Sequence, residues 1–367
     1  MSTVLESFAD TIAFGPGYVS GPTLREGLRA FLESVGDVDL VVATEHVLNA
    51  VNFDPHRVEA QYRRNYGAPP NRVDLIQLQN LREEIENGLG LPIVGALLET
   101  DFYSLKAADV ARLNRQCDFF LAWGSEFFPL GEPRRQEVFS SKATSAWLSF
   151  TQQESSRIVS SGHFVSQSEV WGLPWNARPI SASVLGADYA ARRQARDSLR
   201  GIRGITAGGT ALRGVGYALR PARVRAPAVG LASDWVQSNG FQALIAASKV
   251  SFTCGSALEY PLRKFFEIPA HGALMACDEP EALPTLGFVS GETHMAIDPK
   301  GLPDLVSRVK ARPEWARNVA LAGRRLVMER HSVSARSQQW AAAFSRISEG
   351  SFRGSQWENG EFILRSG

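Results

Sequence analysis

Two glutamates, Glu259 and Glu267, stand eight positions apart in the segment 256–280. We expect this segment to be a loop that runs into a helix near Pro261, because proline fits the first helical turn, where its missing N–H is not needed. Eight residues at about 1.5 Å each span roughly 12 Å along a helix axis. An extended nucleotide-diphosphate sugar separates its sugar from its ribose by a similar length, so the two carboxylates could measure such a ligand.

A basic pair, Arg263 and Lys264, lies between the two glutamates. Both side chains share one face of the expected helix with Glu267, because residues three and four apart are neighbours on a helix. Cations beside a helix N-terminus suit a diphosphate. Glu267 lies in an otherwise apolar run, where a carboxylate is costly unless it is paired or hydrogen-bonded. A ligand hydroxyl could satisfy it, and so could a structural ion pair with Lys264 or Arg263.

The C-terminal half resembles the retaining GT-B glycosyltransferases of the glycosyltransferase group 1 type, and most closely their spore-maturation-protein branch. The resemblance covers about residues 180–345. Beside the paired glutamates it rests on Ile268-Pro269-Ala270-His271-Gly272, an apolar strand expected at 273–276, Gly287-Phe288-Val289-Ser290-Gly291-Glu292, Ile297-Asp298, Leu302-Pro303-Asp304-Leu305 and His331-Ser332. The Gly-Phe-Gly that often follows the first glutamate is Tyr260-Pro261-Leu262 here. The resemblance implies that Glu259 contacts the donor sugar and Glu267 the ribose hydroxyls.

A second set of candidate donor-binding residues opens the C-terminal half. A strand expected at 180–186 ends in Gly186, and Tyr189 and Arg192 follow at the start of a helix. A glycine after a strand with a nearby arginine can cradle a diphosphate, and Arg192 resembles the arginine of the family's Tyr-x-x-Arg segment. A basic helix face exposed to water is the alternative. A further strand at 250–254 would deliver Gly255, Ser256 and Glu259 to the same cleft, and Tyr260 is a further donor-binding candidate beside them.

The N-terminal half is predicted to alternate strands and helices. Buried strands are expected at 39–44, 92–98 and 118–123, and a helix at 22–35. Such alternation indicates parallel strands in a doubly wound sheet, whose ligands gather at the carboxyl ends of the strands. That rule places four residues on the acceptor side of the cleft: Gly15, Gly17, Tyr18 and Asp101. The glycines could equally form a plain turn, and Asp101 could cap a helix.

The length of 367 residues exceeds one compact core, so two domains are expected. We expect a hinge near 171–176. The predicted parts are an acceptor-side Rossmann-like domain at 1–174 and a nucleotide-sugar-binding Rossmann-like domain at 175–333. Residues 334–367 would be a C-terminal helix and a tail; the resemblance implies that the helix crosses back to the first domain.

Charge and cysteine content exclude several classes of protein. A net charge of +1 argues against a dominant nucleic-acid surface. The three cysteines lack paired or metal-type spacing, which indicates a reducing compartment. No apolar run approaches the length of a membrane span. We expect a cytoplasmic protein, with at most a peripheral contact at the inner face of a membrane. The scattered histidines predict no metal site.

The sequence therefore predicts an α/β GT-B glycosyltransferase that moves a sugar from a nucleotide-diphosphate sugar to a carbohydrate or glycoconjugate acceptor. We expect neither a metal nor another cofactor, and the resemblance implies a retaining reaction. The residues expected to act in catalysis are Glu259, Arg192, Lys264 and Asp101, with Arg263 also meeting the charge of the leaving diphosphate. Two alternatives stay open: a nucleotide-sugar epimerase on the same fold, since fold does not fix reaction, and a non-catalytic binding scaffold. The donor base and sugar, the acceptor and the oligomeric state are not predicted.

Overall fold

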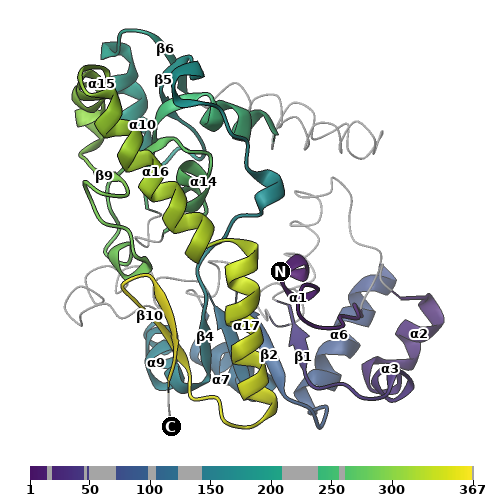
Figure 1. Cartoon of the computed structure of the whole chain (residues 1–367). Coiled ribbons are helices and arrows are strands. Elements are labelled where there is room, and N and C mark those ends of the chain that lie inside the picture. The colour runs from purple at the N-terminus through teal and green to yellow at the C-terminus, as the bar shows by residue number, and fades with distance from the viewer. Residues whose placement is uncertain are drawn as a thin grey trace. The chain divides into compact units, whose positions relative to one another are not determined.

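The computed structural model describes residues 1–14, 19–44, 48, 72–97, 105–122, 143–208, 239–255 and 261–365 (Figure 1). The chain forms two compact units. Unit 1 comprises Met1–Ser161, Ser337–Gln356 and Phe362–Gly367, and unit 2 comprises Gly162–Arg336 and Trp357–Glu361. Each unit contains a parallel sheet with its own helices. The prediction of an α/β chain with two Rossmann-like parallel-sheet units is confirmed.

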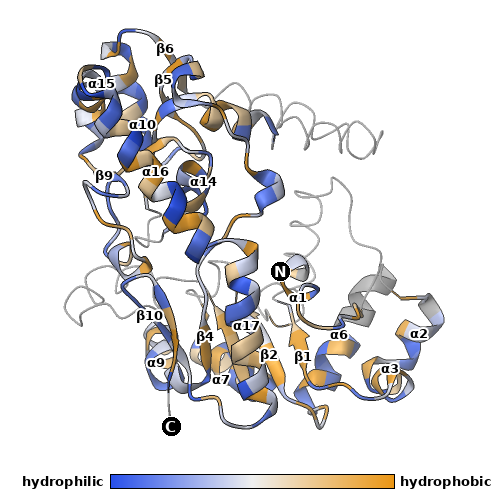
Figure 2. Cartoon of the chain, in the orientation of Figure 1, coloured by the Kyte–Doolittle hydropathy of each residue, from blue (hydrophilic) through white to orange (hydrophobic). Residues whose placement is uncertain are grey.

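The sheet of unit 1 consists of four parallel strands in the order β1-β2-β3-β4. They are β1 (Val41–Ala43), β2 (Ile93–Leu97), β3 (Phe119–Ala122) and β4 (Ile158–Ser160). Parallel strands covered on both faces form continuous apolar runs, and β1 and β2 appear mostly hydrophobic along their length in Figure 2. This character made the first three strands predictable. Strand β4 was not predicted, because it is short and follows the polar segment 152–157.

The helices of unit 1 include one correction to the sequence analysis. The helix expected at 22–35 is two helices, because Gly27 between them has a φ of +94°. The Glu84 carboxylate then accepts the N–H of Arg29 at 2.8 Å and so caps the second helix. The elements are α1 (Ser2–Leu5), α2 (Gly21–Glu26), α3 (Leu28–Val35), α6 (Arg72–Glu86), α7 (Ala107–Gln116), α9 (Ser145–Gln153), the 3-10 turn η4 (Ser155–Arg157) and most of α17 (Val333–Ser348).

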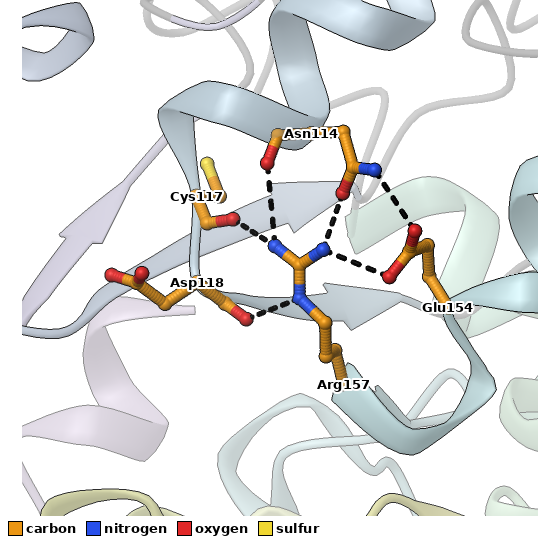
Figure 3. A network of polar contacts seen from close by, with 5 residues as sticks. All are labelled: Asn114, Cys117, Asp118, Glu154 and Arg157. Carbon is orange, nitrogen blue, oxygen red and sulfur yellow. Dashed lines mark hydrogen bonds and ion pairs between the residues drawn. The ribbon is translucent and has the colours of Figure 1, made fainter.

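Arg157 ties the end of α7 to the start of β3 (Figure 3). Its guanidinium donates to the carbonyls of Asn114, Cys117 and Asp118, the last at 2.6 Å, and to Glu154 at 2.8 Å. The last carbonyls of a helix have no partner within the helix, and a basic side chain can satisfy them. This network therefore fixes one end of the unit 1 sheet.

The sheet of unit 2 has five parallel strands in the order β6-β5-β7-β8-β9. The strands are β5 (Ile180–Val184), β6 (Ile205–Gly208), β7 (Ser248–Thr253), β8 (Leu274–Cys277) and β9 (Met295–Ala296). The chain first moves outward from β5 to β6 and then returns to the other side of β5 with β7. The strand order therefore reverses between β5 and β7. In open α/β sheets, ligands bind outside the carboxyl ends of the strands at such a point.

Helices of unit 2 bury one face of this sheet. The core combines alternate strand residues, such as Val184 and Phe252, with Ala195 and Leu305 from helices. The helical elements are η5 (Gln167–Glu169), η6 (Trp175–Ala177), α10 (Ala190–Ser198), η7 (Leu199–Gly201), residues 239–246, α14 (Lys264–Ala270), η8 (Pro284–Leu286), η9 (Pro299–Gly301), α15 (Leu302–Ala311) and α16 (Pro313–Arg330). Helix α14 begins at Lys264, three residues later than the expected start near Pro261.

The C-terminal tail, which the sequence analysis left unassigned, forms a hairpin of β10 (Ser355–Glu358) and β11 (Glu361–Leu364). Its two-residue turn is Asn359-Gly360, with φ values of +50° and +81°, and Asn-Gly is the preferred sequence where both turn residues need positive φ. Within unit 2, Trp357 is fully buried, and its ring lies 5.1 Å from that of His331.

Gly323 in α16 provides a test of helix packing in unit 2. A Cβ added there would collide with the carbonyl oxygen of Thr293 and lie 3.4 Å from the Cβ of Pro269 in α14. We expect Gly323→Ala to lower the free energy of unfolding by about 1–3 kcal/mol, although alanine normally favours a helix over glycine by about 1 kcal/mol. Urea denaturation measures the change, with the exposed Asn318→Ala as a control expected to be neutral or slightly stabilising. A more stable Gly323→Ala protein would contradict this packing.

His331 provides a second prediction. Its Nε2–H donates to the carbonyl of Leu286 at 2.9 Å, while its Nδ1 accepts from Arg336 at 3.2 Å, so the ring is neutral. Burial, and then the charge of Arg336, lower its pKa to about 3. In the unfolded chain the ring has a pKa near 6.5. The neutral ring therefore makes its full contribution to the free energy of unfolding above pH 6.5. As the pH falls from 6.5 toward 3, that free energy decreases by up to about 1.4 kcal/mol per pH unit. Denaturation between pH 7 and 4 should show a shallower slope for His331→Gln, and an equal slope would refute this role.

Candidate functional site

The carboxyl end of β7 is bound by one buried arginine. Arg192, on α10, donates from Nη2 to the Thr253 hydroxyl at 3.0 Å and to the Cys254 carbonyl at 3.4 Å. The residue is 1% exposed, and this burial lowers the pKa of its guanidinium. Its buried Nε has no hydrogen-bond partner, and no carboxylate lies within 4.0 Å of it, among the residues that the structure describes. A buried cation in this setting favours an anion.

Gly186 lies where two cationic side chains meet. It follows the end of β5 and has a φ of +105°, which favours glycine. A Cβ placed on Gly186 would collide with Cε of Lys264 and approach Nη1 of Arg192 to 2.8 Å. Arg196 holds the same loop by donating to the Gly186 carbonyl at 2.6 Å. The structure therefore brings together three predicted donor-binding residues, Gly186, Arg192 and Lys264, which we call the cationic edge.

Lys264, the first residue of α14, reaches the cationic edge from a different element. Its ammonium lies 3.9 Å from Oε2 of Glu267 and 3.9 Å from the ring centroid of Phe241. Its side chain is 22% exposed, so it is partly desolvated while still open to a ligand. Phe241 belongs to the helical residues 239–246, which precede β7.

Arg263 and Glu267 form an ion-paired group beside the cationic edge. Arg263 binds Oε1 of Glu267 through Nε at 3.1 Å and Oε2 of Glu169 through Nη2 at 2.5 Å. Glu267 thus has one cation on each carboxylate oxygen, and its side chain is 13% exposed. The structural ion pair, one of the two interpretations of Glu267, is present. An ionised carboxylate has about four acceptor sites, so a ribose hydroxyl could bind Glu267 beside these two contacts, of which the longer one, to Lys264, is the weaker.

The other predicted site residues lie outside the described part of the chain. They are Gly15, Gly17, Tyr18 and Asp101 on the acceptor side, and Ser256, Glu259 and Tyr260 on the donor side. The distance expected between the carboxylates of Glu259 and Glu267 stays a prediction, as do the roles expected for the acceptor-side residues.

Three residues beside the site were missed by the sequence analysis. Asp278, after β8, accepts the N–H of Gly255 at 3.0 Å and so holds the residue that follows Cys254. Its place after a strand, at the carboxyl edge of a parallel sheet, was a usable signal. Glu169 and Phe241 approach Arg263 and Lys264 from distant segments, and no spacing in the sequence indicates these pairs.

Within the described residues, no group of three or more histidine, cysteine, aspartate or glutamate side chains is arranged to hold a metal ion. None of the helices in that part of the chain combines the length and apolar character needed to cross a bilayer.

Substitution of Gly186 tests the geometry of the cationic edge. Gly186→Ala should destabilise unit 2 by about 1–2 kcal/mol, because a side chain in the left-handed region is strained, and should displace Lys264. Thermal or urea denaturation measures the first effect, and the salt dependence of nucleotide binding reports the second. The matched control is Gly201→Ala, whose new Cβ would meet Pro303 Cγ at an ordinary 3.6 Å. Equal behaviour of the two variants would contradict the close approach.

Residues 192–342 match the family model described as "Glycosyl transferase-like". A comparison with curated proteins gives no match.

Three solved structures are similar at low identity. Anabaena HepE in complex with UDP and glucose has 12% identity and a TM-score of 0.47, covering 88% of this chain and 81% of that one. Sucrose-phosphate synthase from Thermosynechococcus elongatus has 13% identity and a TM-score of 0.46, covering 83% of this chain and 80% of that one. A glycosyltransferase from Rickettsia africae has 11% identity and a TM-score of 0.45, covering 90% of this chain and 96% of that one. TM-scores below 0.5 do not establish a shared fold, so the architecture rests on the strand pairing above. The segment 192–342 is thus similar to a glycosyl transferase-like family.

Proposed function

We propose that the protein is a glycosyltransferase that moves a sugar from a nucleotide-diphosphate sugar to a carbohydrate or glycoconjugate acceptor. The observation that carries the proposal is the cationic edge at the point where the strand order of unit 2 reverses. The missing side chain of Gly186 leaves room there for Arg192 and Lys264, which bring two cations to the carboxyl end of β5. The match of residues 192–342 to a glycosyl transferase-like family supports the same class of reaction.

The proposed chemistry follows from the charge that develops on the donor. When the bond between the sugar and the diphosphate breaks, negative charge grows on the diphosphate oxygens. Cations that are already fixed in a water-poor site stabilise this charge without reorganising. Arg192 is held in place by Thr253 and Cys254, and its fork of N–H donors matches phosphate oxygens. Lys264 adds a second cation, so the two side chains neutralise the leaving group without a metal ion in this proposal.

The remaining roles are proposed for residues predicted from the sequence. Glu259 would contact the donor sugar, and Glu267 the ribose hydroxyls. Asp101 and the Gly15, Gly17 and Tyr18 group would face the acceptor. In a retaining reaction the acceptor hydroxyl attacks on the side from which the diphosphate leaves. A phosphate oxygen can then take the acceptor's proton, so no side-chain base is required.

Nucleotide binding tests the donor side directly. In titration calorimetry with UDP, GDP and ADP, we expect at least one nucleotide to bind the wild type. Arg192→Lys should weaken that binding at least tenfold, because lysine cannot reproduce the planar fork, and Glu267→Ala should abolish it. Arg193→Lys is the matched control, since that neighbouring side chain is 65% exposed and paired with Asp188. Unchanged affinity in Glu267→Ala would remove the ribose role, and unchanged affinity in Arg192→Lys would remove the diphosphate role.

Turnover distinguishes the proposal from its two rivals. A transferase releases free nucleotide from a donor sugar, and faster when an acceptor is present. An epimerase changes the sugar and leaves it attached to the nucleotide, and a binding scaffold does neither. Activity that persists in EDTA would support the metal-independent mechanism, whereas complete loss that Mg²⁺ restores would contradict it.

A further inference from the structure

The aromatic ring of Phe241 contacts the cationic edge through Lys264. The ammonium of Lys264 lies 3.9 Å from the ring centroid. This is well inside the roughly 6 Å at which a cation is attracted to the face of an aromatic ring. Phe241 is itself only partly buried, so it is not a core residue that meets the lysine incidentally.

The path of the Lys264 side chain is fixed at three places. Its backbone starts α14, which the fully buried Phe265 and Phe266 anchor in unit 2. Its Cε passes against Gly186 at the end of β5. Its ammonium then reaches Phe241, on the helix before β7. The ring is thus placed where the lysine's charge must be held if it is to face a ligand at the cationic edge.

A ring and a carboxylate hold a cation with different consequences. A carboxylate cancels the charge, as Glu169 and Glu267 do for Arg263 at 2.5 Å and 3.1 Å. An aromatic face attracts the ammonium but leaves its net charge and its N–H donors available to phosphate oxygens. The contact of Lys264 to Glu267, at 3.9 Å, is at the outer limit of an ion pair. Of the two basic neighbours, Arg263 therefore has the shorter contacts to these two carboxylates, and Lys264 has the contact to the ring.

We propose that Phe241 is a positioning residue for the transfer reaction: its ring holds the Lys264 ammonium at the cationic edge so that it meets the donor diphosphate. This inference rests on the proposed function and deepens it. It assigns the basic pair to separate tasks, with Lys264 acting on the diphosphate and Arg263 orienting Glu267.

The test compares ring chemistry with side-chain volume. Binding of UDP, GDP and ADP is measured by calorimetry for the wild type, Phe241→Leu and Phe241→Trp. Phe241→Leu should weaken binding of the nucleotide that the wild type prefers by about 3- to 30-fold, the range expected for one cation–π contact. Phe241→Trp, which keeps an aromatic face, should stay within about twofold of the wild type or bind more tightly. Loss of affinity in both variants, or in neither, would overturn the inference.

A double-mutant cycle with Lys264→Met isolates the pair. Phe241→Leu should have no further effect in the Lys264→Met protein, and an undiminished effect there would contradict the inference by showing a purely structural role.

Should Phe241→Leu fail to fold, 3,5-difluorophenylalanine at position 241 weakens the ring's attraction for cations at almost constant volume and should lower affinity in the same direction. A wild type that binds none of the three nucleotides would overturn the proposed function itself, and this inference with it. If the wild type binds a nucleotide and substitution of Phe241 leaves the affinity unchanged, the inference alone would be overturned.

Discussion

The structure of unit 2 depends on burying the guanidinium of Arg192 between two strand ends. Burial of a charge costs free energy unless hydrogen bonds or an opposite charge compensate it. Here a hydroxyl and a carbonyl at the end of β7 accept its hydrogen bonds, and the ring centroid of Tyr189 lies 5.1 Å from the guanidinium carbon. These contacts hold the carboxyl end of β7 against α10, and no carboxylate of the described residues forms an ion pair with the guanidinium within 4.0 Å. The same arrangement is therefore a structural joint and an anion-attracting site.

A second buried arginine holds the opposite end of β7. Arg178 donates to the carbonyl of Ser248, where β7 begins, at 2.9 Å and to that of His271, after α14, at 2.7 Å. The strand is thus fixed at both ends by side chains that bind backbone carbonyls. Because His271 directly follows α14, the helix that carries Lys264 and Glu267 is attached to the same strand. Rigid support of this kind lets two cations approach each other at the cationic edge, where their repulsion would otherwise separate them.

Periodicity and apolar runs predicted most of the sheet, because a buried parallel strand must be apolar along its whole length. Pro313 begins α16, along which apolar residues recur. The same rules merged α2 and α3, where the positive φ of Gly27 ends one helix. They also overlooked the hairpin whose Asn359-Gly360 turn was a readable signal. Gly186, Arg192 and Lys264 were predicted as donor-binding residues because each follows a strand or starts a helix, and the structure places them close together. Phe241 and Glu169 were not, because tertiary folding alone brings them to Lys264 and Arg263.

The most direct measurement of the central claim is a crystal structure of the protein with bound UDP or GDP. The account predicts that diphosphate oxygens lie within about 3 Å of the Arg192 guanidinium and the Lys264 ammonium, beside Gly186 at the carboxyl ends of β5 and β7. A well-ordered nucleotide whose diphosphate lies elsewhere, with Arg192 and Lys264 keeping their present contacts, would contradict it.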